Sequence, residues 1–335
     1  MATNRTEKTM DMDHDACLVE VKVSALKGLG VFAKANIPCG SRVLAEPALL
    51  EVKGENAKDI VRAFESLPLS QQNLYLDLHG YACEPFKRAA EREMEQDWQQ
   101  IPELHRRVLA IYAANAFGNV FLLGSRINHS CIPNIHFANN SVLEKETFHA
   151  VRDIVAGEEL TITYIGGTNR TRSQRQAALD KWGFQCTCPA CDNTLQGRKR
   201  EQKRDELLAL DQQLAMDMYI GGGTKKSYTK GLQIAQKMAA IQKSEGLLNR
   251  DLGLSYHDAA RYCLKLRRAK MAILWAEREL EVDRYCLGED HPDYRKGFEI
   301  IGKLKAAVEN SEPLDESVTE WYGFHGPSAD SCIMM

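Results

Sequence analysis

The sequence predicts an α+β protein in which a strand-rich N-terminal domain with a helical insert is followed by an all-α domain. Strand-like alternation of apolar and polar side chains runs through residues 18–23 and 42–52, whereas residues from about 56 to 114 show the spacing of amphipathic helices. Helical spacing returns after three closely spaced cysteines and continues to about residue 310. With 335 residues, the chain is long enough for two domains that each have a hydrophobic core.

The chain divides into four consecutive parts. We expect a polar tail at 1–15, a strand-rich domain at 16–192, a helical domain at 193–310 and a flexible tail at 311–335. In the first domain, the helical insert at about 56–114 is followed by strands at 134–138, 147–151 and 159–164 and by a helix at 171–182. In the second, glycine-containing breaks at 221–223 and 288–292 separate roughly four or five helices.

Charge and composition exclude several classes of protein. The formal net charge is -3 and the apolar content is 44%, so the chain is an ordinary globular protein without a general attraction to nucleic acid, and no direct sequence-specific reading of DNA is expected. The N-terminus has no apolar signal region, and no stretch has the length of a membrane span. We therefore expect reduced cysteines and a location in the cytoplasm, the nucleus or both.

Cys186, Cys188 and Cys191 form a C-x-C-x-x-C cluster. A structural zinc site takes four tetrahedral ligands, commonly all cysteine, so these three thiols leave one position for a ligand from elsewhere in the fold. Cys131, far upstream, offers a fourth thiol. The alternative is that the clustered cysteines are free thiols or a redox pair. The dense spacing favours one structural zinc ion that joins two distant segments.

Three segments, in this order, resemble SET-domain protein lysine methyltransferases. They are Gly28-Leu29-Gly30 followed by Val31-Phe32-Ala33, the run R-x-N-H-S-C-x-P-N at 126–134, and the strand from Gly157 to Tyr164. Taken singly, a G-x-G is more often a plain turn, a lone histidine is usually buried and satisfied, and a tyrosine at the end of a strand is ordinarily a core residue. The rare second run and the shared order favour the family. The resemblance is specific over residues 18–192 and loose over 200–310.

The resemblance implies a β-rich SET domain with a helical insert and a zinc-binding post-SET segment at 182–192. It also implies an S-adenosylmethionine-dependent protein-lysine N-methyltransferase whose catalytic residue is Tyr164. Transfer from a sulfonium is an in-line displacement by a neutral amine, and burial and the neighbouring charge lower the pKa of lysine from about 10.4. The implied cofactor-binding residues are Lys27, Gly28, Leu29, Gly30, Asn115, Asn128, His129 and Phe184. The implied zinc ligands are Cys131, Cys186, Cys188 and Cys191.

Two departures from the family pattern stand out. Trp182 occupies a position where related enzymes often have tyrosine; an indole can wall a substrate channel, but it cannot both donate and accept a hydrogen bond as a phenol does. The number of methyl groups added is therefore not set by the sequence. The insert contains a single cysteine, Cys83, so the MYND zinc finger of SET-and-MYND proteins is missing.

The second domain resembles the tetratricopeptide (TPR)-type hairpins in the C-terminal half of SET-and-MYND proteins. Ala272, Trp275-Ala276 and Leu280 lie at the spacing of one helix face, although no 34-residue repeat is visible. We expect a protein substrate that presents a lysine, with histones among the candidates, and a protein partner on the helical domain. The alternatives are a non-histone or small-molecule substrate, and a non-catalytic SET and TPR-like interaction module.

The last four residues, Cys332-Ile333-Met334-Met335, match a C-a-a-X prenylation box whose terminal methionine indicates a farnesyl chain. A frayed tail with a stray thiol is the alternative. One lipid chain without a polybasic patch gives only weak, reversible attachment to a membrane, and residues 323–331 contain no lysine or arginine. We therefore expect at most weak membrane attachment through a prenyl group at Cys332.

Overall fold

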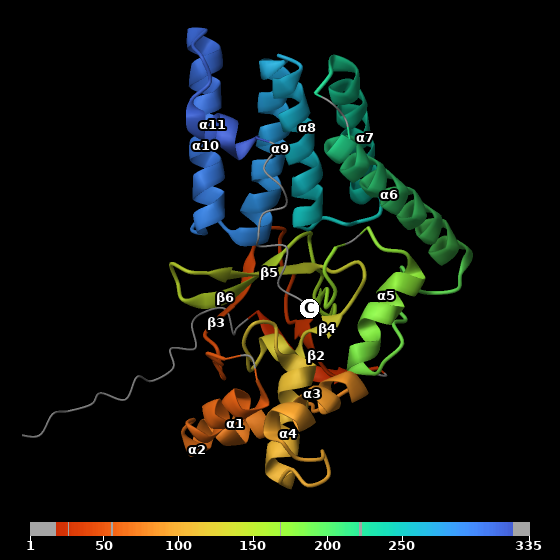
Figure 1. The fold of residues 1–335 in the computed structure, drawn as a ribbon, viewed down its shortest axis with the longest axis vertical. Helices are drawn as coiled ribbons and strands as arrows, with labels where there is room; N and C mark the ends of the chain where they lie inside the picture. The colour runs from red at the N-terminus through yellow and green to blue at the C-terminus, as the bar shows by residue number, and fades with distance from the viewer. Residues whose placement is uncertain (1–17, 26, 55, 168, 221–222, 324–335) are drawn as a thin grey trace, which may run out of the picture.

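A computed structural model describes residues 18–323, except for residues 26, 55, 168 and 221–222 and the side chains of 217–220. Its elements are arranged in tiers along the long axis (Figure 1): the helical domain lies at one end, the strands in the middle and the insert helices at the other end. The predicted α+β architecture, with a helical C-terminal part, is confirmed. The predicted C-a-a-X box lies outside the described residues.

The strands form three small sheets. An antiparallel hairpin joins β1 to β2, a three-stranded antiparallel sheet has the order β3-β6-β5, and a short parallel pair joins β4 to β7. Their bounds are β1 Val19–Ser24, β2 Gly28–Ala33, β3 Arg42–Glu46, β4 Asn128–His129, β5 Ile135–Asn140, β6 Lys145–Ala150 and β7 Thr161–Ile162. The strand expected over 42–52 ends at Glu46, because Pro47 has no N–H to donate to a sheet.

The parallel pair β4–β7 brings two distant segments together. Asn128 is opposite Thr161 and His129 is opposite Ile162, and the N–H of Ser130 continues the ladder to the carbonyl of Ile162 over 2.9 Å. The strand expected over 159–164 is therefore only two residues long, but it pairs with the 126–134 segment that the sequence analysis singled out. The core beneath it contains Val31, Ile127, Phe148, Leu160 and Ile162, all at most 2% exposed.

The insert between β3 and β4 is helical, as expected. Its helices are α1 Ala57–Glu65, α2 Leu69–Leu76, α3 Glu84–Met94 and α4 Glu103–Asn115. Asn56 caps α1 by accepting the N–H of Asp59, and Pro85 lies in the first turn of α3, where its missing N–H costs nothing. The insert has its own core, and its last helix ends at Asn115, which lines the same cavity as Ile162 of β7.

After β7, a short helix leads to the cysteine cluster. Helix α5, Arg172–Leu179, begins with a capping box in which Thr171 and Gln174 exchange side-chain-to-backbone hydrogen bonds. The 3₁₀ turn η3, Asp180–Trp182, follows it directly, so the helix predicted at 171–182 corresponds to α5 and η3 together. Gly183 then ends the turn with φ near +73°, a left-handed conformation that favours glycine, and its Cβ position lies against the ring of Tyr81.

Helices make up the described remainder of the chain. They are α6 Leu195–Ile220, α7 Lys225–Ser244, α8 Arg250–Lys265, α9 Ala269–Leu287, α10 Pro292–Asn310 and α11 Glu316–Trp321. The breaks predicted at 221–223 and 288–292 separate α6 from α7 and α9 from α10. One expectation is corrected: part of the tail predicted to be flexible from residue 311 forms α11, because Val318 and Tyr322 bury apolar surface against Ile300 and Leu304 of α10.

The helical domain rests on the three-stranded sheet. Helix α9 packs against β5 and β6, and Val151, just after β6, shares a core with Leu252, Val282 and Tyr285. The loop before α10 adds polar links, since Asp290 pairs with Arg42 of β3 and His291 bonds the carbonyl of Asn139 over 3.0 Å. The two domains therefore share one continuous interface.

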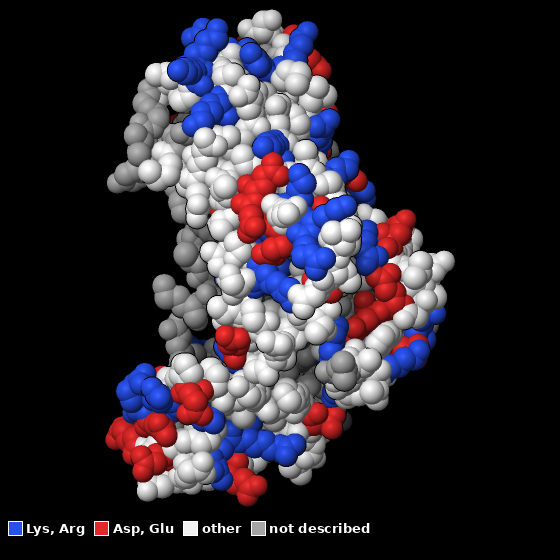
Figure 2. Space-filling model, turned by 90° about the vertical axis from the view of Figure 1, so that its right-hand side faces the viewer, with Lys and Arg blue, Asp and Glu red and all other residues white. Residues whose placement is uncertain are grey.

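Charged side chains of both signs are interspersed over the face drawn in Figure 2, which agrees with the small net charge. A broad basic field of the kind that tracks a nucleic-acid backbone does not cover this face. Among the described residues, the helices lack the combination of length and apolar character needed to cross a membrane.

Candidate active site and metal site

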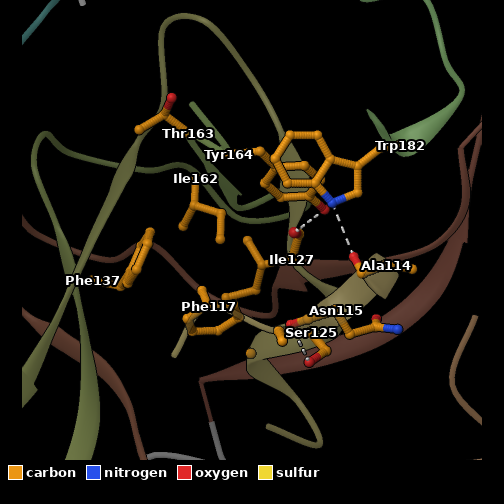
Figure 3. Close-up of a pocket in the computed structure, with 12 residues that line it drawn as sticks. Ala114, Asn115, Phe117, Ser125, Ile127, Phe137, Ile162, Thr163, Tyr164 and Trp182 are labelled. Carbon is orange, nitrogen blue, oxygen red and sulfur yellow. Dashed lines mark hydrogen bonds between the residues drawn. The ribbon is translucent and has the colours of Figure 1, made fainter. Parts of the chain in front are cut away.

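A narrow cavity lies where the end of α4, the segment before β4, strand β7 and η3 meet (Figure 3). Its volume is about 30 Å³, room for little more than one or two water molecules or a thin alkyl chain. The cavity is mostly apolar. Its lining residues are Ala114, Asn115, Ala116, Phe117, Gly124, Ser125, Ile127, Phe137, Ile162, Thr163, Tyr164 and Trp182.

Tyr164 forms one wall of this cavity, and hydrogen bonds fix both its hydroxyl and its backbone N–H. Its hydroxyl donates to the carbonyl of Ile127 over 2.8 Å, and its backbone N–H donates to Nδ1 of His129 over 3.0 Å. Burial raises the pKa of Tyr164 well above its ordinary value, so the phenol remains protonated and neutral at physiological pH. A neutral, fixed phenol can orient a reacting group, but it is not a strong base.

Two further aromatic rings surround Tyr164. The indole of Trp182 lies 5.2 Å from the ring of Tyr164, and its Nε1 donates to the carbonyl of Ala114 over 3.1 Å, which ties the segment before the cysteine cluster to the end of α4. Phe184 lies edge-on at 6.4 Å from Tyr164 and remains 36% exposed. An exposed ring beside a narrow apolar cavity offers a flat surface on which a planar ligand can stack.

The glycine turn lies against the segment that precedes the cysteine Cys131. The side-chain amide of Asn128 donates to the carbonyl of Leu29 over 3.0 Å and to Oε1 of Glu159 over 2.7 Å. A Cβ on Gly30 would lie only 2.7 Å from that same Glu159 oxygen, so only glycine fits there without a shift. Gly28, with φ near +76°, has open space around it.

Glu159 connects the glycine turn to β7. Beyond its bond to Asn128, it accepts from Nζ of Lys27 over 3.0 Å. Its pKa is lowered, since the hydrogen bonds and charge from Asn128, Ser24 and Lys27 together outweigh the desolvation that comes from burial. The predicted cofactor residue Lys27 is thus paired within the protein, and Leu29 is exposed at 45% on the outer side of the turn.

Asn115, at the end of α4, lines the cavity, and its side-chain amide points away from Phe117 and Ile162 (Figure 3). Its Nδ2 donates to the carbonyls of His79 and Ile111 over 2.6 and 2.7 Å. Both partners are acceptors, so the orientation of the amide is determined by the network. Its Oδ1 has no hydrogen-bond partner among the residues the structure describes, and it can accept from an ammonium or N–H group of a ligand.

His129 is 4% exposed, and both of its ring nitrogens are engaged within the protein. Nδ1 accepts from the N–H of Tyr164, so the proton of the neutral ring lies on Nε2, which is 3.3 Å from Sγ of Cys131. Burial lowers the pKa of His129 to about 4, which keeps the ring neutral. A contact of His129 with a cofactor is therefore restricted to its backbone, whereas its ring positions Tyr164 and Cys131.

The four predicted metal ligands come together. Sγ of Cys131 lies 3.9 Å from Sγ of Cys186 and 3.6 Å from Sγ of Cys191, and the four sulfur atoms, including that of Cys188, lie within 4.8 Å of one another. Tetrahedral zinc with bonds of about 2.3 Å would separate its sulfur ligands by about 3.8 Å. The spacing of the thiols therefore fits one zinc ion and requires no rearrangement of the fold.

Two buried arginines surround the cysteine cluster. Nη2 of Arg175 lies 3.4 Å from Sγ of Cys191, and Nη2 of Arg204 donates to the carbonyl of Cys131 over 2.7 Å; both residues are 1% exposed. A zinc ion with four thiolates is doubly negative, and the two guanidinium groups supply positive charge beside it, with Arg175 also paired to Glu201 over 3.2 Å. Positive charge at this depth favours thiolates, and with them a metal centre, over four neutral thiols.

Sequence reasoning missed several residues that organise the site. Besides Glu159 and the two arginines, Asn134 is 1% exposed and links its own segment to residues 158–161, since its amide donates to Glu158 and its Oδ1 accepts the N–H of Thr161 over 2.7 Å. No local signal marks these roles, because each partner lies far away in the chain. The one local indication was that Asn134 ends the 126–134 run. The candidate lipidation residue Cys332 lies outside the described residues.

Comparison with protein families places the site in context. Residues 28–165 match the SET domain family model. Over 278 residues, which cover 81% of this chain and 79% of the relative, the chain is 29% identical to the histone-lysine N-methyltransferase set5 of Schizosaccharomyces pombe. It is also 28% identical over 192 residues to the histone-lysine N-methyltransferase SMYD3 of Mus musculus, covering 54% of this chain and 42% of that relative.

Among solved structures, the fold has a remote likeness to Rubisco LSMT bound to sinefungin and monomethyllysine. The two share 14% sequence identity with a TM-score of 0.37 over 93% of each chain.

Proposed function

Because residues 28–165 of this chain are a SET domain, we propose that the protein is an S-adenosylmethionine-dependent protein-lysine N-methyltransferase. The observation that carries the proposal is the convergence of Tyr164, Asn115 and Trp182 on one narrow apolar cavity beside the glycine turn and the exposed ring of Phe184. The histone-lysine methyltransferases of fission yeast and mouse named above support it as relatives.

The cofactor side of the site is the glycine turn with Asn115, Asn128 and Phe184. S-adenosylmethionine offers an ammonium group, a carboxylate and an adenine ring, and it supplies an activated methyl group on a sulfonium. The free Oδ1 of Asn115 suits the ammonium group, and the exposed face of Phe184 suits the adenine. Open space at Gly28 lets ligand atoms approach the backbone closely.

The cavity of about 30 Å³ is the proposed lysine channel. Its small volume suits the methylene chain of a lysine and excludes bulk water, and its apolar walls favour the neutral amine over the ammonium form. Tyr164 and Trp182 line it side by side, with their ring centroids 5.2 Å apart. Because the Tyr164 phenol stays protonated, its role is to orient the amine and the methyl group in line, with the Ile127 carbonyl holding the hydroxyl.

The cysteine cluster is proposed to bind one structural zinc ion that fixes the post-SET segment. Cys186 is two residues from Phe184 and four from Trp182, so the metal would set the position of both aromatic walls. Zinc is not needed for the chemical step. Its contribution is to hold the residues that bind cofactor and substrate.

A protein that presents a lysine is the proposed substrate, with histones as the first candidates because both named relatives carry that activity in their names. Cytoplasm and nucleus both suit such a substrate. Helices α7 to α10 form two successive antiparallel hairpins, which supports a TPR-like helical domain beside the methyltransferase domain.

The experiment that tests the proposed function is transfer of a radiolabelled methyl group from S-adenosylmethionine. Core histones and a lysate from the native host serve as acceptors, and calorimetry measures cofactor binding by the same preparation. Labelled lysine supports the proposal. Cofactor binding without labelled protein from either acceptor would replace it with a SET-shaped interaction module.

A further inference from the structure

A second and larger cavity lies between the SET domain and the helical domain. Its volume is about 590 Å³, within the range of pockets that bind a ligand or peptide side chains. It shares no lining residue with the cavity beside Tyr164. Helices α7, α8 and α9 form its walls, and Cys39 with the Val151–Asp153 loop of the SET domain closes one end.

The two longer walls are single faces of α7 and α9. Gln236, Ala239, Ala240 and Lys243 lie at helix-face spacing on α7, and Trp275, Arg278 and Val282 do so on α9. Between them, Tyr256 of α8 packs at 5.7 Å from Trp275 and forms an aromatic floor. The groove therefore combines an apolar floor with a polar rim, as peptide-binding sites do.

The charges on the rim are not balanced. Asp153 accepts the N–H of Cys39 over 2.8 Å, Glu281 is held by two nitrogens of Arg284 at 2.8 and 2.7 Å, and Arg152 is paired with Glu158. The Arg152–Glu158 and Arg284–Glu281 pairs therefore contribute little net charge, whereas Asp153 at the closed end keeps its negative charge because its partner is a neutral N–H.

Two cations remain without a carboxylate partner among the described residues: Lys243 of α7 and Arg278 of α9. The guanidinium of Arg278 stacks on Trp275 with its Cζ 4.4 Å from the ring centroid, which orients it and leaves its N–H groups available to an acceptor. The rim thus presents two free positive charges on opposite walls above an aromatic floor.

We propose that this groove is a docking site for an acidic segment of a partner protein, which places an apolar side chain on Tyr256 and Trp275 and carboxylates beside Lys243 and Arg278. A basic, lysine-bearing segment is repelled by the same two cations, so the groove does not hold the region that carries a methylated lysine. The docking site is independent of the proposed methyltransferase activity, because it shares no residue with the cavity beside Tyr164.

The test uses fluorescence anisotropy with a short fluorescein-labelled peptide in which glutamate and leucine alternate. A matched peptide of lysine and leucine serves as the charge control. The protein variants are Lys243→Glu/Arg278→Glu in the groove and Lys226→Glu/Lys270→Glu outside it. Lys226 and Lys270 are exposed, lie on the same two helices and do not line the groove, so both double variants change the net charge equally.

We expect saturable binding of the glutamate peptide to the full-length protein, weakened by added salt and reduced about tenfold or more in the groove variant, with little change in the control variant. Methyl transfer should be unaffected in both variants. Equal loss in the two variants, tighter binding of the lysine peptide, or no saturable binding to the wild type would each overturn the proposal. So would binding of phosphatidylserine vesicles at these cations in the absence of peptide binding.

Discussion

The N–H of Tyr164 donates to Nδ1 of His129 over 3.0 Å, and the opposite nitrogen of the same ring lies 3.3 Å from Sγ of Cys131. One buried imidazole thus joins the wall of the narrow cavity to the cysteine cluster. The neutral state of the ring, favoured by burial, is what allows one nitrogen to accept while the other donates. The position of Tyr164 therefore depends on the position of Cys131.

His129→Ala should lower the free energy of unfolding by about 2 kcal/mol and reduce both zinc retention and methyl transfer, because a buried N–H loses its acceptor and a thiolate loses a donor. Thermal unfolding, metal analysis and turnover measure the three effects. His105→Ala, which removes a partly exposed contact with Glu65, is the control and should change stability by less than about 1 kcal/mol. A His129→Ala protein with normal zinc content and turnover would show that the ring does not link the two sites.

Cys188→Ser should abolish stoichiometric zinc binding and weaken cofactor binding, since Trp182 and Phe184 are held by the segment that the metal closes. Structural zinc contributes on the order of 10 kcal/mol to small folds, so the post-SET segment should become sensitive to protease. Metal analysis of undenatured protein should give about one zinc per chain. The half-buried Cys83 lies outside the cluster, and Cys83→Ser should keep the metal.

Full zinc retention after Cys188→Ser, or after Cys131→Ser, would contradict the four-thiol assignment. The second variant is the sharper one, because Cys131 comes from a different part of the chain than the other three ligands.

Gly30→Ala should weaken cofactor binding and destabilise the fold by about 1 to 3 kcal/mol, because the new Cβ would lie 2.7 Å from Glu159 and 2.8 Å from Asn128. Gly302→Ala, on the exposed side of α10 with no atom near its Cβ position, should instead stabilise the protein by up to about 1 kcal/mol. Calorimetric titration with S-adenosylmethionine and thermal unfolding distinguish the two. Wild-type cofactor affinity in Gly30→Ala would mean that the turn does not contact the ligand.

The buried carboxyl of Glu146 should make the free energy of unfolding depend on pH. Burial raises its pKa to about 7 and outweighs the hydrogen bond from Asn139. A carboxyl whose pKa is raised on folding binds more protons in the native state, so its contribution favours the fold at low pH and is lost as pH rises from about 4.5 to about 7. The loss should be on the order of 3 kcal/mol, at about 1.4 kcal/mol per pKa unit.

Glu146→Gln should remove that part of the pH dependence and raise the free energy of unfolding at pH above 7, as measured by urea denaturation across the pH range. The exposed Glu312→Gln should leave the profile unchanged. An unaltered profile in Glu146→Gln would show that this carboxyl does not titrate in the predicted window.

The sequence predicted the order of elements well where the signals are local. The helical insert, the helix before the cysteines and the breaks around 221–223 and 288–292 follow from periodicity, prolines and glycines, which act within a few residues. The strand over 42–52 was predicted too long, because Pro47 cannot donate a backbone hydrogen bond and ends the strand at Glu46. Helix α11 was missed, because its apolar face is short and is buried only by contact with α10.

The site was predictable as a set of motif residues, but not as a network. Cys131 was assigned with the distant cysteines because zinc chemistry requires a fourth ligand. The engagement of both His129 nitrogens, the anchoring role of Glu159 and the burial of Arg175 and Arg204 depend on contacts across large sequence separations. Such contacts leave no periodic or compositional trace in one sequence.

The hydroxyl of Tyr164 is the group on which the proposed chemistry depends. If its hydroxyl orients the amine and methyl group, Tyr164→Phe should bind S-adenosylmethionine nearly as well as the wild type, because the interaction operates in the transition state rather than in the bound ground state. Its turnover should fall on the order of 100-fold.

The most direct measurement is single-turnover transfer of a tritiated methyl group to lysine in core histones and in a native-host lysate, with wild type and Tyr164→Phe compared at equal cofactor occupancy. We predict labelled lysine with the wild-type protein and a rate lower by about two orders of magnitude in the variant. Equal rates would remove Tyr164 from the mechanism. An absence of labelled lysine from the wild type, with cofactor bound, would contradict the proposed methyltransferase function.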